Sequence, residues 1–391
     1  MPQNNKKLHK AKKAKNDEFY TDYDVIQSEL NYYEDKFEGK TVLCNCDNPF
    51  ESNFVKFFLR NFNYLKLKRL IGTSYAGSPG TDTQLSLLDD YNEPVSSQHG
   101  YVLDITNVPM SNGRGVSDAD ITALLHQKDV VKRLKGNGDY ASDECLSYLK
   151  QSDIVVTNPP FSKFRSYLAR LIEYDKKFLI IGNVNAIIYK EVFSLIQHKQ
   201  LWLGASIHSG DREFRVPDDY PLKASRTRVD DEGHKYIRVN GVRWFTNLDY
   251  ERHYEDLTLH KHYLPNEYPK YDNYDGINVD KTADIPLDYD GIMGVPITFL
   301  DKYNPDQFEI LGLSGKVGYG LCSNKFYGDY KEAKHDGSYT GASGKKTNGN
   351  PVLQGMPKRS HYFINKSGRT VYSLYARIFI RNKHLEDYQN N

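Results

Sequence analysis

The prediction of the fold starts from one stretch of the sequence, Asp153-Ile154-Val155-Val156-Thr157-Asn158-Pro159-Pro160-Phe161. Its β-branched run ends at a double proline, which is typical of a short buried strand. Similar apolar runs lie on both sides of it and alternate with stretches of helical spacing. They predict strands at 41–47, 69–72, 101–105, 177–182 and 201–207, and helices at 54–59, 142–150, 162–174 and 186–197. Strands that alternate with helices predict an α/β fold, in which helices cover both faces of a parallel sheet.

The four residues Asn158-Pro159-Pro160-Phe161 follow the predicted strand, at the edge where parallel sheets bind ligands. An aromatic amine is a poor nucleophile because its lone pair is delocalised into the ring. The side-chain oxygen of Asn158 and the carbonyl of Pro159 can accept its two hydrogens and localise the pair, while the prolines fix the backbone. Phe161 offers a face on which a base can stack. We interpret these as catalytic residues; the alternative is a strand-to-helix turn that is merely stiffened by proline.

Composition limits the remaining possibilities. The net charge is only +1, so attraction to nucleic acid must come from local patches. No apolar run is long enough to span a bilayer, and the first residues do not resemble a secretory signal. The four cysteines show no zinc-ligand spacing and are typical of thiols in a reducing compartment. We therefore expect a cytoplasmic protein with no metal and no membrane partner.

The sequence divides into three regions. Residues 1–15 carry six lysines and are expected to form a basic flexible arm. Residues 16–248 hold the alternating pattern and end in a predicted hairpin with its turn at Asn240-Gly241. Residues 249–391 are rich in Tyr, Asp, Asn, Pro and Gly, and residues 337–350 are expected to be flexible. The first half thus predicts a catalytic domain and the second a mixed, loop-rich region.

Several segments carry a resemblance to a known family. Residues 153–161 resemble the catalytic motif of amino-methyltransferases that act on nucleic-acid bases. Segments 16–21, 44–54, 138–144, 294–303 and 377–381 resemble one branch, the EcoRI-type adenine-specific DNA modification methylases. The resemblance implies a Rossmann-like methyltransferase sheet and a target-recognition region in residues 249–391. It further implies methyl transfer from S-adenosylmethionine to the exocyclic amino group of adenine, after the base is flipped out of duplex DNA.

The same resemblance implies which residues bind S-adenosylmethionine. Asp139 and Tyr140 match the position near the cofactor adenine. The other candidates lie in an amino-terminal motif and in the turn after the first strand: Phe19, Tyr20, Thr21, Asn45, Asp47, Pro49, Phe50 and Ser52. This turn has no glycine, so an ordinary capped strand-to-helix turn is the alternative. The second strand ends at 71–74 without an acidic residue, which leaves the ribose contact unassigned.

Double-stranded DNA is the expected partner of a monomeric enzyme, and a companion restriction endonuclease would be a functional partner. Candidates for phosphate contacts are the amino-terminal lysines, Arg212, Arg215, Lys345, Lys346, Lys358 and Arg359. Three alternatives remain open: methylation of RNA adenine, methylation of protein glutamine, and a DNA-binding protein without catalysis. The intact Asn158-Pro159-Pro160-Phe161 argues against the last.

Overall fold

The computed structural model describes residues 20–46, 48–76, 99–110, 115–127, 129–208, 210–216, 227–315, 320–357 and 361–384. These residues form two compact units. The first holds the described residues up to Ala186 together with Trp202–Tyr250, and the second holds Ile187–Leu201 and the described residues from Glu251 onward. Predicted site residues Phe19 and Asp47, the basic arm, Lys358 and Arg359 lie outside the described residues.

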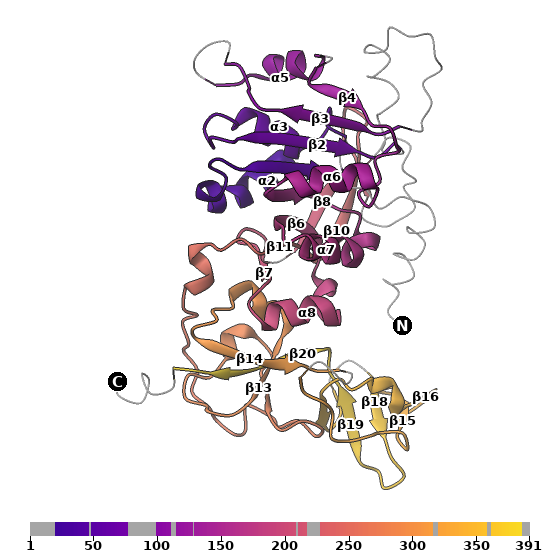
Figure 1. Ribbon diagram of the computed structural model, residues 1–391. Coiled ribbons are helices and arrows are strands. Elements are labelled where there is room, and N and C mark those ends of the chain that lie inside the picture. The colour runs from indigo at the N-terminus through magenta and orange to yellow at the C-terminus, as the bar shows by residue number, and fades with distance from the viewer. Residues whose placement is uncertain are drawn as a thin grey trace. The chain divides into compact units, whose positions relative to one another are not determined.

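An eight-stranded sheet forms the centre of the first unit, in the order β4-β3-β2-β1-β5-β6-β11-β7 (Figure 1). Its central strands β2, β1, β5 and β6 are parallel to one another. In contrast, β3 is antiparallel to β2, and β11 is antiparallel to both β6 and β7. The strands are β1 (Thr41–Asn45), β2 (Arg69–Ser74), β3 (Tyr101–Ile105), β4 (Val131–Arg133), β5 (Ile154–Thr157), β6 (Lys177–Asn183), β7 (Trp202–Leu203) and β11 (Val242–Thr246).

The predicted parallel sheet is therefore correct for the four central strands and wrong for β3. A parallel neighbour needs a crossover connection, usually a helix, whereas an antiparallel neighbour does not. The strand expected at 201–207 also ends early, because the backbone amides of Ala205 and Ser206 donate hydrogen bonds to the buried carboxylate of Glu29 (2.8 and 2.7 Å).

Helices lie on both faces of this sheet. Adjacent residues of β11 point to opposite faces. The Trp244 ring contacts Phe54 of α3 (centroids 6.0 Å apart), whereas the Phe245 ring contacts Phe164 of α7 (4.9 Å). The helices of this unit are α2 (Tyr23–Leu30), η1 (Asn31–Lys36), α3 (Asn53–Arg60), α5 (Asp118–Leu125), α6 (Asp143–Gln151), η3 (Phe161–Lys163) and α7 (Phe164–Glu173), and η4 (Val184–Ile188) follows β6 at the edge of the unit.

A second, three-stranded sheet in the same unit has the order β8-β10-β9, formed by Asp211–Val216, Lys235–Asn240 and Thr227–Val229. The turn at Asn240-Gly241 is present, with Gly241 in the left-handed region (φ 72°). The predicted hairpin is nevertheless wrong, because β10 pairs with β8 and β9 while β11 pairs with β6 and β7. Every residue of β11 is buried and β10 is only partly so, hence the turn carries the chain from one sheet into the other.

The second unit contains a four-stranded sheet, β12-β13-β20-β14, and a five-stranded sheet, β16-β15-β18-β19-β17 (Figure 1). Its strands are β12 (Ile277–Asn278), β13 (Met293–Pro296), β14 (Phe308–Leu313), β15 (Lys331–Ala333), β16 (Tyr339–Ser343), β17 (Val352–Gln354), β18 (Tyr362–Ile364), β19 (Thr370–Ser373) and β20 (Arg377–Asn382). Its helices are α8 (Lys190–Gln197), η5 (Glu251–Tyr254), η6 (Thr282–Asp284), η7 (Ile297–Lys302) and η8 (Gly344–Thr347).

Two polar side chains of this unit organise its loop-rich sequence. Asn273 is fully buried; its Nδ2 donates to the carbonyl of Asn350 (3.0 Å), and its Oδ1 accepts from the amide of Val352 (2.8 Å). Residues 337–350, which we expected to be flexible, form β16 and η8. There Lys346 donates a hydrogen bond (2.7 Å) to the buried carboxylate of Glu332. This glycine-rich stretch is therefore ordered, contrary to our expectation.

In the described part of the chain, no helix combines the length and apolar character needed to cross a membrane.

Candidate active site

The site lies where the order of the central strands changes direction. From β1 the chain passes to β2 on one side, whereas β5 and β6 lie on the other side of β1. Such a switch point leaves a crevice at the carboxyl ends of the two strands that flank it, and ligands of open α/β sheets bind there. The turn after β1 and Asn158 after β5 both lie at this edge. The sequence thus placed both segments at the correct ends of neighbouring strands.

Asn158 is held by a residue from the amino-terminal motif. Its side chain is 6% exposed, and its Nδ2 donates a hydrogen bond to Oγ1 of Thr21 (3.2 Å). Thr21 is itself 3% exposed, and its carbonyl accepts a hydrogen bond from Nδ2 of Asn53 (2.8 Å) at the start of α3. Thr21 therefore links three segments that are far apart in the sequence.

The prolines and the aromatic residue of the motif connect β5 to a helix. Pro159 is buried, Pro160 is half-buried, and Phe161 opens the short helix η3 that leads into α7. Phe161 is partly buried and packs against the same core as α2 and α3. Phe161 is therefore held in part by packing and remains partly accessible.

The described residues of the turn after β1 form several hydrogen bonds with one another, although the turn contains no glycine. Cys46 adopts a left-handed backbone conformation (φ 75°), which is uncommon for a residue with a side chain. The Oδ1 of Asn48 accepts from the amide of Phe50 (3.1 Å), and its carbonyl accepts from that of Ser52 (2.8 Å). Ser52 then caps α3 by accepting from the amide of Val55 (3.3 Å). Asn48 Nδ2 is buried and has no hydrogen-bond partner among the described residues.

Asn45, the last residue of β1, accepts hydrogen bonds from two buried residues of the first unit. The hydroxyl of Tyr167 on α7 donates to its Oδ1, and the hydroxyl of Thr157 on β5 donates to its carbonyl. Burial raises the pKa of Tyr167 well above its usual value, so the phenol remains a donor. These bonds join the ends of β1 and β5 and fix the two strands that flank the switch point.

Asp139 and Tyr140 lie beside α7. The Tyr140 ring meets the ring of Tyr167 edge-on (5.1 Å between centroids), and its hydroxyl is 2.9 Å from that of Ser166. Lys163 extends toward both residues: its Nζ lies 5.4 Å from the centre of the Tyr140 ring and 3.6 Å from the Asp139 carboxylate. Tyr140 therefore contacts the helix that follows the catalytic motif.

Pro49 is buried in the turn after β1, and Phe50 borders a cavity of about 460 Å³. The Phe50 ring is 6.3 Å from that of His126, and Asn53 and Lys56 of α3 also line the cavity. Burial lowers the pKa of Lys56, although nearby Glu51 opposes this shift. Phe50 thus contributes to a wall between the turn and α5.

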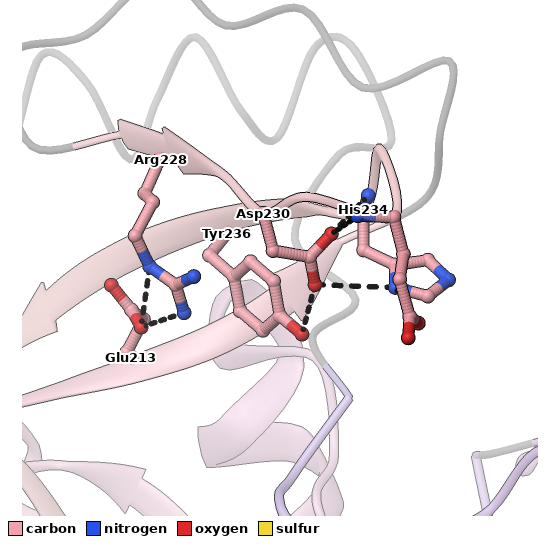
Figure 2. Close-up of polar contacts among 6 residues, drawn as sticks. Glu213, Arg228, Asp230, His234 and Tyr236 are labelled. Atoms are coloured by element: carbon pink, nitrogen blue, oxygen red, sulfur yellow. Dashed lines mark hydrogen bonds and ion pairs between the residues drawn. The ribbon is translucent and has the colours of Figure 1, made fainter.

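Tyr20 extends the three-stranded sheet. Its amide donates to the carbonyl of Arg215 on β8 (3.0 Å). Figure 2 shows the polar network on this sheet, in which Arg228 binds Glu213 (2.6 Å) and stacks over Tyr236, with its guanidinium carbon 4.2 Å from the ring centre. The hydroxyl of Tyr236 donates to Asp230 (3.1 Å), which also lies 3.2 Å from Nδ1 of His234.

This network affects the electrostatics next to the site. A hydrogen bond from Arg228 holds the pKa of Glu213 below its usual value. Burial raises the pKa of Asp22, the neighbour of Thr21, and Glu213 and Asp24 raise it further. The amino-terminal motif is therefore attached to a sheet in which the carboxylate of Glu213 is paired with Arg228.

The candidate phosphate contacts divide by unit. Arg212 and Arg215 lie on β8 of the first unit, and both are half-buried. Lys345 and Lys346 lie in η8 of the second unit, where Lys346 is bound to Glu332. The charge of Lys346 is already matched, which makes Lys345 the better candidate of the two.

Sequence reasoning assigned Thr21 only to the cofactor and did not identify Asn48, Asn53 or Tyr167. Asn48 and Asn53 could have been noticed, because both lie in a segment that carries the family resemblance. No local pattern indicates the contact of Tyr167 with Asn45, which joins residues 122 positions apart.

The chain matches known proteins along most of its length. The family described as "Adenine-specific methyltransferase EcoRI" matches residues 7–383. The chain is 48% identical over 309 residues to the Type II methyltransferase M.EcoRI of Escherichia coli, which covers 78% of this chain and 89% of that protein. It is 38% identical over 308 residues to the Type II methyltransferase M.MgeORF184P of Mycoplasma genitalium, covering 78% and 85%. No solved structure matches the chain.

A mixed α/β unit with Asn-Pro-Pro-Phe at its switch point, matched along nearly all of the chain, defines an enzyme that is an adenine-specific methyltransferase. The chain belongs to the family of the adenine-specific methyltransferase EcoRI. The predicted family is therefore confirmed.

Proposed function

We propose that this enzyme transfers a methyl group from S-adenosylmethionine to the exocyclic amino group of adenine within a specific sequence of duplex DNA. The observation that carries the proposal is the buried amide of Asn158, fixed by Thr21 at the switch point of the sheet. The names of the relatives support the same conclusion, since each is a type II methyltransferase. The first unit would be the Rossmann-like catalytic domain, and the second would contribute to target recognition.

The residues of the motif would prepare the amine for attack. Asn158 and the carbonyl of Pro159 accept its two hydrogens, which draws the nitrogen out of conjugation with the ring. Phe161 provides the stacking face, and the two prolines hold the acceptors in place before the base arrives. The neutral amine nitrogen would form the N–CH₃ bond as the S–CH₃ bond of the sulfonium breaks and leaves a neutral thioether, and the nitrogen would then lose its proton to solvent. No general base with a shifted pKa is therefore needed.

S-adenosylmethionine, when bound, supplies an electrophilic methyl group. The donors near the turn after β1 fit such a group, because Asn48 offers a buried N–H that lacks a partner among the described residues. A buried donor of this kind is expected to have an acceptor, and a cofactor carboxylate would provide one. Tyr20, Asp139 and Tyr140 would complete the site together with Phe19 of the amino-terminal motif and the turn residues, including Asp47.

The duplex must deliver its adenine to this edge of the sheet. Flipping a base out of the stack costs a few kcal/mol, and stacking on Phe161 would offset part of it. Phosphate contacts from Arg212, Arg215 and Lys345 would position the duplex, since phosphate contacts set register while base-edge contacts set specificity. We further propose that the enzyme acts as a monomer in the cytoplasm, within a restriction–modification system whose endonuclease is a functional partner.

The test is methyl transfer from labelled S-adenosylmethionine to unmodified duplex DNA, followed by digestion and identification of the labelled nucleoside. We expect N6-methyladenine, and we expect Asn158→Ala to abolish it while DNA binding is retained. Label in RNA or in protein glutamine, and none in DNA, would overturn the choice of substrate. Near wild-type transfer by Asn158→Ala would overturn the role of Asn158.

A further inference from the structure

The side-chain amide of Asn158 can accept a hydrogen bond from the substrate amine only if its Oδ1, and not its Nδ2, faces that amine. Its oxygen accepts hydrogen bonds and its nitrogen donates them, and the two occupy similar volumes. If the amide were rotated by about 180° about χ2, its Nδ2 would face the substrate amine, and two hydrogen-bond donors would oppose each other. A residue that binds Nδ2 therefore contributes to the reaction without touching the substrate.

Thr21 is placed to perform this task. Its Oγ1 lies 3.2 Å from Nδ2 of Asn158, and both side chains are almost completely buried. Since Nδ2 and Oδ1 lie on different corners of one planar group, binding the nitrogen restricts the directions open to the oxygen. A buried hydroxyl is also a more rigid anchor than water, because its Cβ is fixed to the backbone.

Thr21 is in turn held from two sides. Its carbonyl accepts from Nδ2 of Asn53 (2.8 Å), and Asn53 is the first residue of α3, directly after the cap at Ser52. The preceding residue, Tyr20, pairs with Arg215 of β8 (3.0 Å). The hydroxyl therefore has little freedom to follow Asn158 if that side chain rotates.

We propose that Thr21 is a positioning residue, which orients the amide of Asn158 for methyl transfer rather than serving chiefly to bind the cofactor. The proposal rests on the proposed function of Asn158. In this proposal the hydroxyl of Thr21 binds Asn158 of the catalytic motif, and the carbonyl of Thr21 binds Asn53, which follows the turn after β1. The segments expected to bind the cofactor and the catalytic motif then form one hydrogen-bonded assembly.

The experiment compares Thr21→Val, which removes the hydroxyl at nearly constant volume, with Thr21→Ser, which retains it. The measurements are single-turnover methyl transfer at saturating S-adenosylmethionine, the equilibrium Kd for S-adenosylmethionine, and thermal unfolding. We expect Thr21→Val to lower the transfer rate roughly 10- to 100-fold, as for a small misplacement of a reacting group. We expect its Kd to stay within about twofold of wild type, since the oriented group is not a cofactor contact. Thr21→Ser should recover most of the rate.

Thr246→Val is the matched control. Thr246 is also fully buried in the first unit, where its hydroxyl donates to the carbonyl of Phe178 (2.7 Å) and accepts from the amide of Leu248 (3.0 Å). It should lower thermal stability without lowering the transfer rate of the folded enzyme. An equal loss of rate in Thr246→Val would attribute the effect of Thr21→Val to general loosening and overturn the proposal.

Other outcomes also decide the question. An unchanged rate in Thr21→Val, or a rate restored by excess cofactor together with a raised Kd, would overturn the positioning role. Should Thr21→Val fail to fold, Asn53→Ala replaces it, and we expect a smaller loss of rate at an unchanged Kd. If the wild-type enzyme methylates an amine other than DNA adenine, the proposed substrate fails, and the same variants are compared on that amine.

Discussion

Asn158 and Thr21 are 137 residues apart in the sequence, yet Nδ2 of the first lies 3.2 Å from Oγ1 of the second. The contact joins the end of a central strand to a segment that precedes the whole sheet. It is possible because Thr21 is also fastened to α3 through Asn53. The amino-terminal motif and the tetrapeptide are therefore joined by a hydrogen bond between two buried side chains of the first unit.

Asn48 provides a test of the cofactor site. Asn48→Asp keeps the oxygen that accepts from the amide of Phe50, and it replaces the buried donor Nδ2 by a carboxylate oxygen. We expect the Kd for S-adenosylmethionine to rise at least about tenfold. The N–H proposed to bind the cofactor carboxylate would be replaced by a negatively charged oxygen, which repels that carboxylate. Equilibrium binding measures this, with Asn61→Asp at the other end of α3 as control. An equal Kd in both variants would contradict the contact.

Tyr167 is expected to stabilise the junction of β1 and β5. Tyr167→Phe removes the hydroxyl that donates to Asn45 and leaves a buried acceptor without it. Such a change should lower the free energy of unfolding by about 1–3 kcal/mol, as measured by urea denaturation. The control is Tyr64→Phe, which removes an exposed hydroxyl bonded to Glu34 and should change little. Equal effects of the two variants would be evidence against a structural role for the Tyr167 hydroxyl.

Asp272 should make the second unit sensitive to acid. Burial alone would raise the pKa of this carboxyl, but hydrogen bonds from Lys325 and Tyr327 and the charge of Arg369 outweigh burial and lower it. Because the folded pKa lies below the unfolded value of 3.8, the stabilisation is present above pH 3.8 and is lost as the pH falls through the folded pKa.

Unfolding of wild type and Asp272→Asn should therefore differ most at neutral pH and converge in acid. Thermal unfolding at neutral pH and at successively lower pH measures the difference, with Asp290→Asn as a control that removes an exposed carboxylate of the same unit. A gap that stays constant across this range would show that the ionisation of Asp272 does not contribute.

The amino-terminal lysines should contribute to DNA affinity through their charge. Deleting residues 1–15 is expected to weaken binding to duplex DNA and to reduce the dependence of log K on log salt, because fewer counterions are released. A full-length variant with glutamine at Lys6, Lys7, Lys10, Lys12, Lys13 and Lys15 separates charge from chain length, and it should behave like the deletion. A salt slope equal to that of wild type would assign no DNA contact to the arm.

The sequence alone determined those features that depend on neighbouring residues. The run 154–156 with its double proline predicted β5 and the turn after it, and the observed β3 has its predicted bounds. The motif and the segments around it predicted the adenine-specific methyltransferase family, which is confirmed. Periodicity and short motifs are local properties, so they can be recognised without knowing what each segment contacts.

Only the tertiary structure decided which segments pair. It made β3 antiparallel, divided the expected hairpin between two sheets, and ordered residues 337–350 by giving Lys346 the buried carboxylate of Glu332. It also brought Thr21 to Asn158 and Tyr167 to Asn45. These contacts join residues far apart in the chain, and their stability comes from burial and from hydrogen bonds shielded from water. A local pattern carries no information about such partners, because the free energy that selects them exists only once the core has formed.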